Sequence, residues 1–175
     1  NYGRNILIEE LDPRAVLNSG TPAPLSMVQG VDSGVDAAMF VGYHARVGTA
    51  RAILDHTWSS GRVDGVWLSY GGRDELVPVG EIGLNAAVCG HFGAPVLMIS
   101  GDQNACAEAT ALLGDMETAV VKRATGRNAA ECLPPEATTQ MIRDAAERAT
   151  RRLKSGDAPA PRRLTPPITV AVEFI

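Results

Sequence analysis

Residues 95–100 (PVLMIS) form an almost wholly apolar run that leads directly into Gly101-Asp102. A short apolar run of this kind is typical of a strand buried on both faces of a sheet. Residues 104–113 then have the spacing of a helix, and residues 118–122 (TAVVK) supply another strand. A strand, a helix and a second strand in this order favour helices packed on a mostly parallel sheet.

The same alternation extends through the rest of the chain. Strands are expected at residues 37–43, 65–70, 76–79 and 169–174, with Gly71-Gly72 as a hairpin turn. Helices are expected at residues 81–92 and 134–152. Residues 154–167 are expected to form an exposed loop. We therefore expect an α/β fold with a mostly parallel sheet flanked by helices, in a single domain that spans residues 1–175 and is partial at its N-terminus.

Composition narrows the class of protein further. The chain has 175 residues, 45% of them hydrophobic, which is enough for one domain with a buried core. Its net charge of -4 argues against a nucleic-acid partner, and no apolar run approaches the roughly 20 residues that span a membrane. Cys89, Cys106 and Cys132 form no C-x-x-C pair, which favours reduced, mostly buried thiols in a cytoplasmic protein.

Three side chains have the chemistry of a hydrolytic metal site. His44 follows an apolar strand in GYHAR, His56 lies in ILDHTWS, and Glu81 stands in the first turn of a predicted helix in VGEIGLNA. Two imidazoles and a carboxylate are the ligand types of hydrolytic zinc sites. Spacing alone leaves a structural role open for each, because loop histidines cap strands and an N-terminal Glu favours the helix dipole.

Other candidates have simpler interpretations. His91 stands where a helix is ending and reads as a surface or capping histidine. Asp102 reads as a helix cap rather than a site carboxylate. Trp58 and Trp67 read as core or subunit-contact residues, and no serine has a recognisable catalytic triad.

Four segments form an ordered set: GYHAR (residues 42–46), HTWS (56–59), VGEIGLNA (79–86) and PVLMISGD (95–102). Their order and rough spacing resemble those of the zinc-dependent D-aminopeptidases of the DppA type. The resemblance extends to PLSMVQGVD (residues 24–32) and AVVKRATGRNAAECLPP (119–135), and so covers nearly the whole chain.

The resemblance implies a role for each candidate residue. His44 and Glu81 match zinc ligands of the family, and His56 matches its proposed catalytic histidine. The family completes a site of two Zn²⁺ ions with a D-x-E-G segment and an N-D-x-H segment, which this sequence lacks. The further ligands are therefore expected upstream of residue 1.

The implied activity is hydrolysis that removes N-terminal D-amino acids from short peptides, in a ring-shaped homo-oligomer. Two alternatives remain open. The chain could be an amino-acid amidase of the same fold, or a non-catalytic α/β scaffold that has lost its site.

Overall fold

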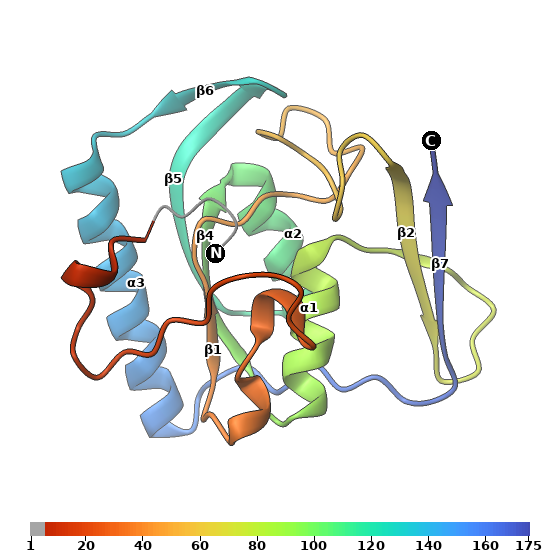
Figure 1. Cartoon of the computed structure of the whole chain (residues 1–175), viewed down its shortest axis with the longest axis horizontal. Coiled ribbons are helices and arrows are strands. Elements are labelled where there is room, and N and C mark those ends of the chain that lie inside the picture. The colour runs from red at the N-terminus through yellow and green to blue at the C-terminus, as the bar shows by residue number, and fades with distance from the viewer. Residues whose placement is uncertain (1–5) are drawn as a thin grey trace.

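The computed structural model describes residues 6–175, which form two β-sheets and the helices around them (Figure 1). The strands are β1 (Ala38–Phe40), β2 (Val63–Tyr70), β3 (Val77–Pro78), β4 (Val96–Asp102), β5 (Glu117–Gly126), β6 (Ala129–Cys132) and β7 (Ile168–Phe174). The α-helices are α1 (Glu81–His91), α2 (Gln103–Leu113) and α3 (Pro135–Ser155), and the 3-10 helices are η1 (Ile8–Glu10), η2 (Ser26–Val28) and η3 (Val31–Ser33).

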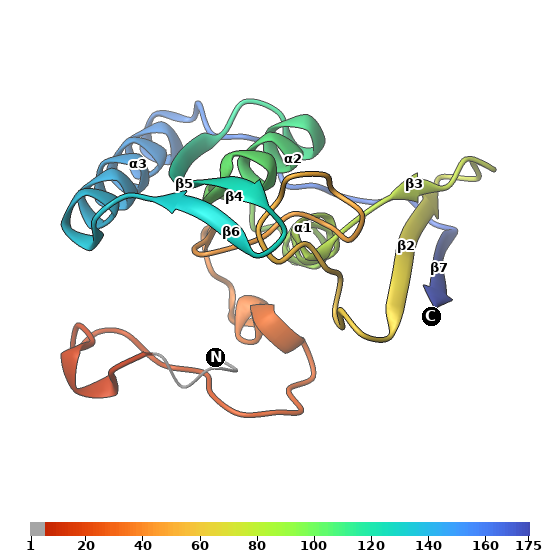
Figure 2. The same cartoon turned by 90° about the horizontal axis from the view of Figure 1, so that it is seen from above.

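The first sheet has the order β1-β4-β5-β6. Strand β4 runs parallel to both β1 and β5, and every one of its residues is buried, as its apolar sequence predicts. Helix α3 covers one face of this sheet, and α1 and α2 cover the other (Figures 1 and 2). The α/β class with a mostly parallel sheet flanked by helices is therefore confirmed.

The second sheet has the order β3-β2-β7 and is antiparallel. The predicted hairpin is present, with Trp67 opposite Pro78 across the turn. The last strand, β7, pairs with β2 instead of joining the parallel sheet, and β6 folds back antiparallel on β5. Strand β6 was not predicted from the sequence. The pairing of β7 does not follow from it either, because hydrophobic patterns predict strands but not their partners.

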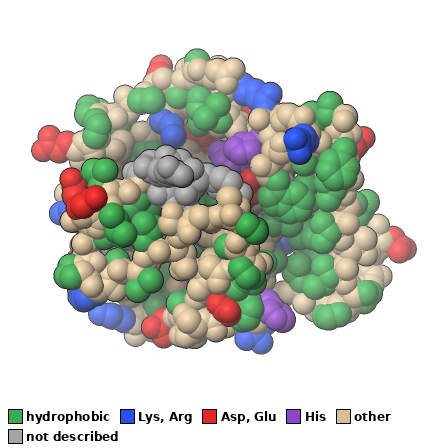
Figure 3. All heavy atoms as spheres, viewed as in Figure 1, with side chains coloured by type: hydrophobic (Ala, Val, Ile, Leu, Met, Phe, Trp, Pro, Cys, Tyr) green, Lys and Arg blue, Asp and Glu red, His purple; other side chains and the backbone are tan. Residues whose placement is uncertain are grey.

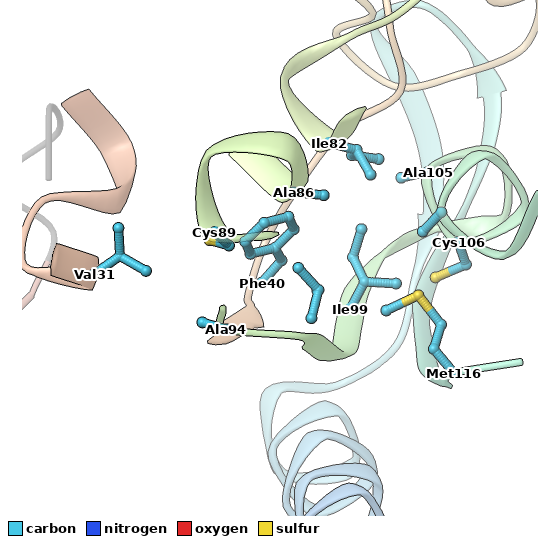
Figure 4. Packing of buried hydrophobic residues seen from close by; sticks show 12 residues of the cluster. Val31, Phe40, Ile82, Ala86, Cys89, Ala94, Ile99, Ala105, Cys106 and Met116 are labelled. Carbon is cyan, nitrogen blue, oxygen red and sulfur yellow. The ribbon is translucent and has the colours of Figure 1, made fainter. Parts of the chain in front are cut away.

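The largest core cluster lies between the first sheet and helices α1 and α2 (Figure 4). Phe40 of β1 packs there with Ile82, Ala86 and Cys89, which lie on the buried face of α1. Phe92, the residue that follows the helix, is exposed. All three cysteines are free, and Cys132 is exposed whereas the other two are buried.

A strap of residues 156–167 carries the chain from α3 past α1 to the second sheet (Figure 1). It is not the wholly exposed loop that its composition predicts. The Arg162 guanidinium donates a hydrogen bond of 2.7 Å to the Leu112 carbonyl oxygen, and the backbone of Arg162 passes directly over Gly90 of α1. A Cβ atom on Gly90 would lie 2.0 Å from the Arg162 carbonyl oxygen.

Gly90→Ala is therefore expected to destabilise the protein. Alanine alone would favour the helix by roughly 1 kcal/mol, but the clash with the strap backbone should reverse the sign and cost about 1–3 kcal/mol. Urea unfolding measures the change, with Gly61→Ala as the control because a Cβ there meets nothing within 4 Å. Equal stability of the two variants would show that the strap does not bear on Gly90.

Candidate metal centre

His44 lies just beyond the carboxyl end of β1, where the chain continues alongside β4. The Tyr43 N–H donates to the Ser100 carbonyl oxygen at 2.9 Å, and the Gly42 N–H donates to the Ser100 hydroxyl at 3.0 Å. Gly101 permits this close passage, because a Cβ there would lie 2.6 Å from the Tyr43 carbonyl oxygen. His44 thus reaches the edge of the sheet at which α/β folds bind their ligands.

Glu81 is the first residue of α1, and it points back toward the loop that carries His44. Gly80 before it allows this contact, since a Cβ on Gly80 would lie 2.8 Å from the Arg46 Cα. The Glu81 Oε1 atom accepts a 2.8 Å hydrogen bond from the Trp58 N–H. The predicted helix start, with a close backbone approach at its glycine, is confirmed.

His56 approaches the same point from the loop that follows His44. Its ring stacks on that of His44, with centroids 3.8 Å apart and an interplanar angle of 18°. The loop is tied to the β5–β6 turn, because the Leu54 N–H donates to the Arg127 carbonyl oxygen at 2.7 Å. His44, His56 and Glu81 therefore come together, although the first and last are far apart in the sequence.

The three side chains present their ligand atoms to one small volume. His44 Nε2 lies 3.3 Å from Glu81 Oε2, His56 Nε2 lies 4.0 Å from Glu81 Oε1, and the three groups have ligand atoms within 4.8 Å of one another. Glu81 is buried and both histidines are half-buried. This arrangement is compact enough for one ion to contact all three groups.

The hydrogen bond made by Nδ1 of each histidine determines whether its Nε2 carries a hydrogen or a lone pair. His44 Nδ1 lies 3.0 Å from the Ala45 carbonyl oxygen, and His56 Nδ1 lies 2.6 Å from the Leu54 carbonyl oxygen. A carbonyl only accepts, so each Nδ1 must carry the hydrogen, and each neutral ring presents a lone pair at Nε2. Metal-binding histidines have this arrangement. Two lone pairs and a carboxylate facing one another favour a cation between them, which can be a metal ion or a proton.

Without a metal ion, a proton meets part of this requirement. Burial works to lower the pKa of His44, but its hydrogen bonds to Glu81 and Ala45 outweigh burial and raise the pKa. Burial works to raise the pKa of Glu81, but hydrogen bonds from His44 and the Trp58 N–H outweigh it and lower the pKa. Both shifts favour the same ion pair, which fits a site built for positive charge.

Three carboxylates hold the loop that carries the histidines. Glu108 of α2 accepts from the Arg46 N–H at 2.8 Å, Asp55 accepts from the Gly48 N–H at 2.8 Å, and Asp102 accepts from the Ile53 N–H at 2.7 Å. Glu108 and Asp55 could not be predicted from the sequence, because nothing in the local pattern around them indicates a contact with a distant segment. Burial raises the pKa of Glu108.

The structure also shows where the other candidate residues, Asp102, His91 and Trp58, lie. Asp102 is the N-cap of α2 and is fully buried, so the predicted cap is confirmed. His91 is exposed at the end of α1, as predicted. Trp58 is 52% exposed, which excludes the core alternative and leaves the subunit contact as a prediction. Its backbone N–H, rather than its ring, contacts Glu81.

The peptidase M55 family model, described as D-aminopeptidase, matches residues 1–175. The chain belongs to this D-aminopeptidase family. It is 37% identical to a D-aminopeptidase of Bacillus subtilis in an alignment 175 positions long, which covers 97% of this chain and 58% of the relative. The D-aminopeptidase match thus spans little more than half the length of that protein.

A solved structure agrees. The chain superposes with a TM-score of 0.80 and 38% identity on the Zn-dependent D-aminopeptidase DppA from Bacillus subtilis, described as a self-compartmentalizing protease, again over 97% of this chain and 58% of that one. Membership in the D-aminopeptidase family therefore rests on both sequence and fold. Within residues 6–175, none of the helices combines the length and apolarity that crossing a bilayer requires.

Proposed function

We propose that this protein uses zinc to remove N-terminal D-amino acids from short peptides. The observation that carries the proposal is the convergence of two Nε2 lone pairs and one buried carboxylate on a point that needs a cation. Imidazole and carboxylate are zinc ligands of hydrolytic enzymes. The D-aminopeptidase relatives supply the substrate class.

In this proposal His44 and Glu81 hold the metal and His56 handles the proton. Zinc bound there would polarise the scissile carbonyl and lower the pKa of a water molecule to about 7. Glu81 keeps its charge because the Trp58 N–H and His44 both favour the carboxylate. His56, with its Nδ1 fixed against Leu54 and its Nε2 free, accepts a proton from the attacking water and returns it to the leaving amine.

The proposal includes a second zinc ion, a homo-oligomer and a cytoplasmic location. Two Zn²⁺ ions per site would need more ligands than His44 and Glu81 provide. We place the further ligands in the part of the family's length that this chain does not span, since it covers 58% of the relative. A homo-oligomer is supported by exposed apolar side chains over β2 and β7 (Figure 3), among them Val170, Phe174 and Ile175. Free cysteines support a cytoplasmic protein.

The experiment follows free D-alanine release from D-Ala-D-Ala by the full-length gene product, before chelation, after chelation and after zinc is restored. We expect release that is lost on chelation and returns with zinc, with L-Ala-L-Ala cleaved far more slowly. Release from D-alaninamide but not from the dipeptide would favour the amidase alternative. No turnover of either substrate with zinc present would favour the scaffold.

A further inference from the structure

A pocket of about 370 Å³ opens beside His56. Its walls come from two segments: Leu54, His56 and Ser60 of the histidine loop, and Arg127 and Asn128 of the β5–β6 turn. The volume is that of a small-molecule site, large enough for one amino-acid residue. Because His56 belongs to both the pocket and the metal centre, a peptide could lie across the two.

The lining of this pocket includes one cationic side chain. Within residues 6–175 it contains an arginine, an amide and a hydroxyl, and no carboxylate. These groups donate hydrogen bonds, and a guanidinium is the preferred partner of a carboxylate. The chemistry of the walls therefore fits a ligand with a negative end.

Arg127 is held in place while part of its guanidinium stays free. Its Nε lies 3.0 Å from Asp55 Oδ1, and its Nη2 donates to the Asp55 carbonyl oxygen at 3.0 Å. Its Nη1 has no hydrogen-bond partner among residues 6–175, and the side chain is 54% exposed. A donor group that is oriented by its neighbours loses little entropy when it binds a ligand.

We propose that this pocket binds the residue on the leaving side of the scissile bond, with Arg127 pairing its free carboxylate. This inference rests on the proposed function and deepens it, since it makes the enzyme selective for dipeptides. A dipeptide places its carboxylate one residue beyond the bond that is cleaved. A longer peptide places an uncharged amide at that position and leaves the Arg127 guanidinium without its anion.

The structure also offers a purely structural role for Arg127, which the experiment must separate from substrate binding. Its side chain joins the β5–β6 turn to Asp55, one residue before His56. If that were its whole contribution, its loss would disturb His56 and would slow every substrate alike. The backbone link from Leu54 N–H to the Arg127 carbonyl oxygen does not depend on the side chain and stays in any substitution.

The test compares D-Ala-D-Ala with D-Ala-D-alaninamide, which has the same scissile bond but no carboxylate. The full-length zinc-loaded wild-type protein should prefer the free acid. In Arg127→Gln, kcat/KM for D-Ala-D-Ala should fall about tenfold to a hundredfold, mainly through KM, as expected for loss of a charge-assisted hydrogen bond. The value for the amide should change less than about threefold. Arg127→Lys should recover part of the preference.

Arg123→Gln is the matched control, because Arg123 is exposed on the same hairpin and lies outside the pocket. It should leave both substrates unchanged. Equal kcat/KM of the wild type for the two substrates, or an equal fall for both in Arg127→Gln, would overturn the pocket assignment while the peptidase activity stands. Failure of the wild type to cleave either substrate would overturn the proposed function and this inference together.

Discussion

His44→Ala is expected to lose zinc and turnover together, whereas His56→Ala should lose turnover and keep most of its zinc. The difference follows from the geometry of the two rings. His44 is the more buried, and its Nε2 lies 3.3 Å from the Glu81 carboxylate, against 4.0 Å for His56. Removal of a general base costs roughly a hundredfold to ten-thousandfold in rate, so kcat of His56→Ala should fall by at least about a hundredfold.

Metal analysis of the purified variants, together with kcat on D-Ala-D-Ala, measures both effects. His91→Ala serves as the control histidine, because it is exposed at the far end of α1 from Glu81 and should change neither quantity. Zinc loss in His56→Ala as complete as in His44→Ala would make His56 a ligand rather than the proton carrier. Near-normal turnover of His56→Ala would remove it from the chemistry altogether.

Asp102→Ala is expected to have the largest effect on stability. The fully buried carboxylate accepts hydrogen bonds from three backbone N–H groups: Asn104 at 2.9 Å, Ala105 at 2.8 Å and Ile53 at 2.7 Å. Alanine would remove the cap of α2 and leave the part-buried Ile53 N–H of the histidine loop without its acceptor. Loss of a cap costs about 1 kcal/mol, and each unsatisfied buried group about 1–3 kcal/mol. We expect a total of about 2–5 kcal/mol in the free energy of unfolding.

Urea unfolding of the metal-free protein checks this, with Asp115→Ala as the control. Asp115 pairs with Arg152 on the surface, where its side chain is 93% exposed, so its removal should change stability very little. Asp102→Asn separates the two roles of this side chain, because an amide keeps one acceptor oxygen and replaces the other oxygen with a donor NH₂ group. It should retain much of the helix cap and lose the Ile53 contact. Equal stability of Asp102→Ala and Asp115→Ala would contradict the central place given to this carboxylate.

Local patterns were enough to predict most of the secondary structure. The apolar run that became β4, the Gly71-Gly72 turn and the helix that begins at Glu81 all depend on neighbours in sequence, and all three are present. The pairing of β7 with β2 could not be predicted in the same way, because it depends on a strap that crosses α1. The exposure of Trp58 has a similar cause, since the position of its loop is fixed by distant acceptors.

The sequence singled out the three candidate side chains but not the geometry that brings them together. Ligand types and family motifs pointed to His44, His56 and Glu81, and their convergence needed three segments to meet at one edge of the sheet. Arg127 lay inside a segment that resembled the family, yet nothing local indicated a role for it. Its relation to His56 appears only when the β5–β6 turn is placed beside the histidine loop.

The three carboxylates that fasten the histidine loop have a consequence for how the proposed site would acquire a metal ion. Glu108, Asp55 and Asp102 engage backbone N–H groups at successive points of the loop, so both rings occupy their positions once the chain has folded. The entropy of ordering the ligands is then lost during folding and is not subtracted from the affinity for the metal. Such a site releases and regains its ion by breaking and making ligand bonds alone, with no part of the backbone refolding around the vacancy.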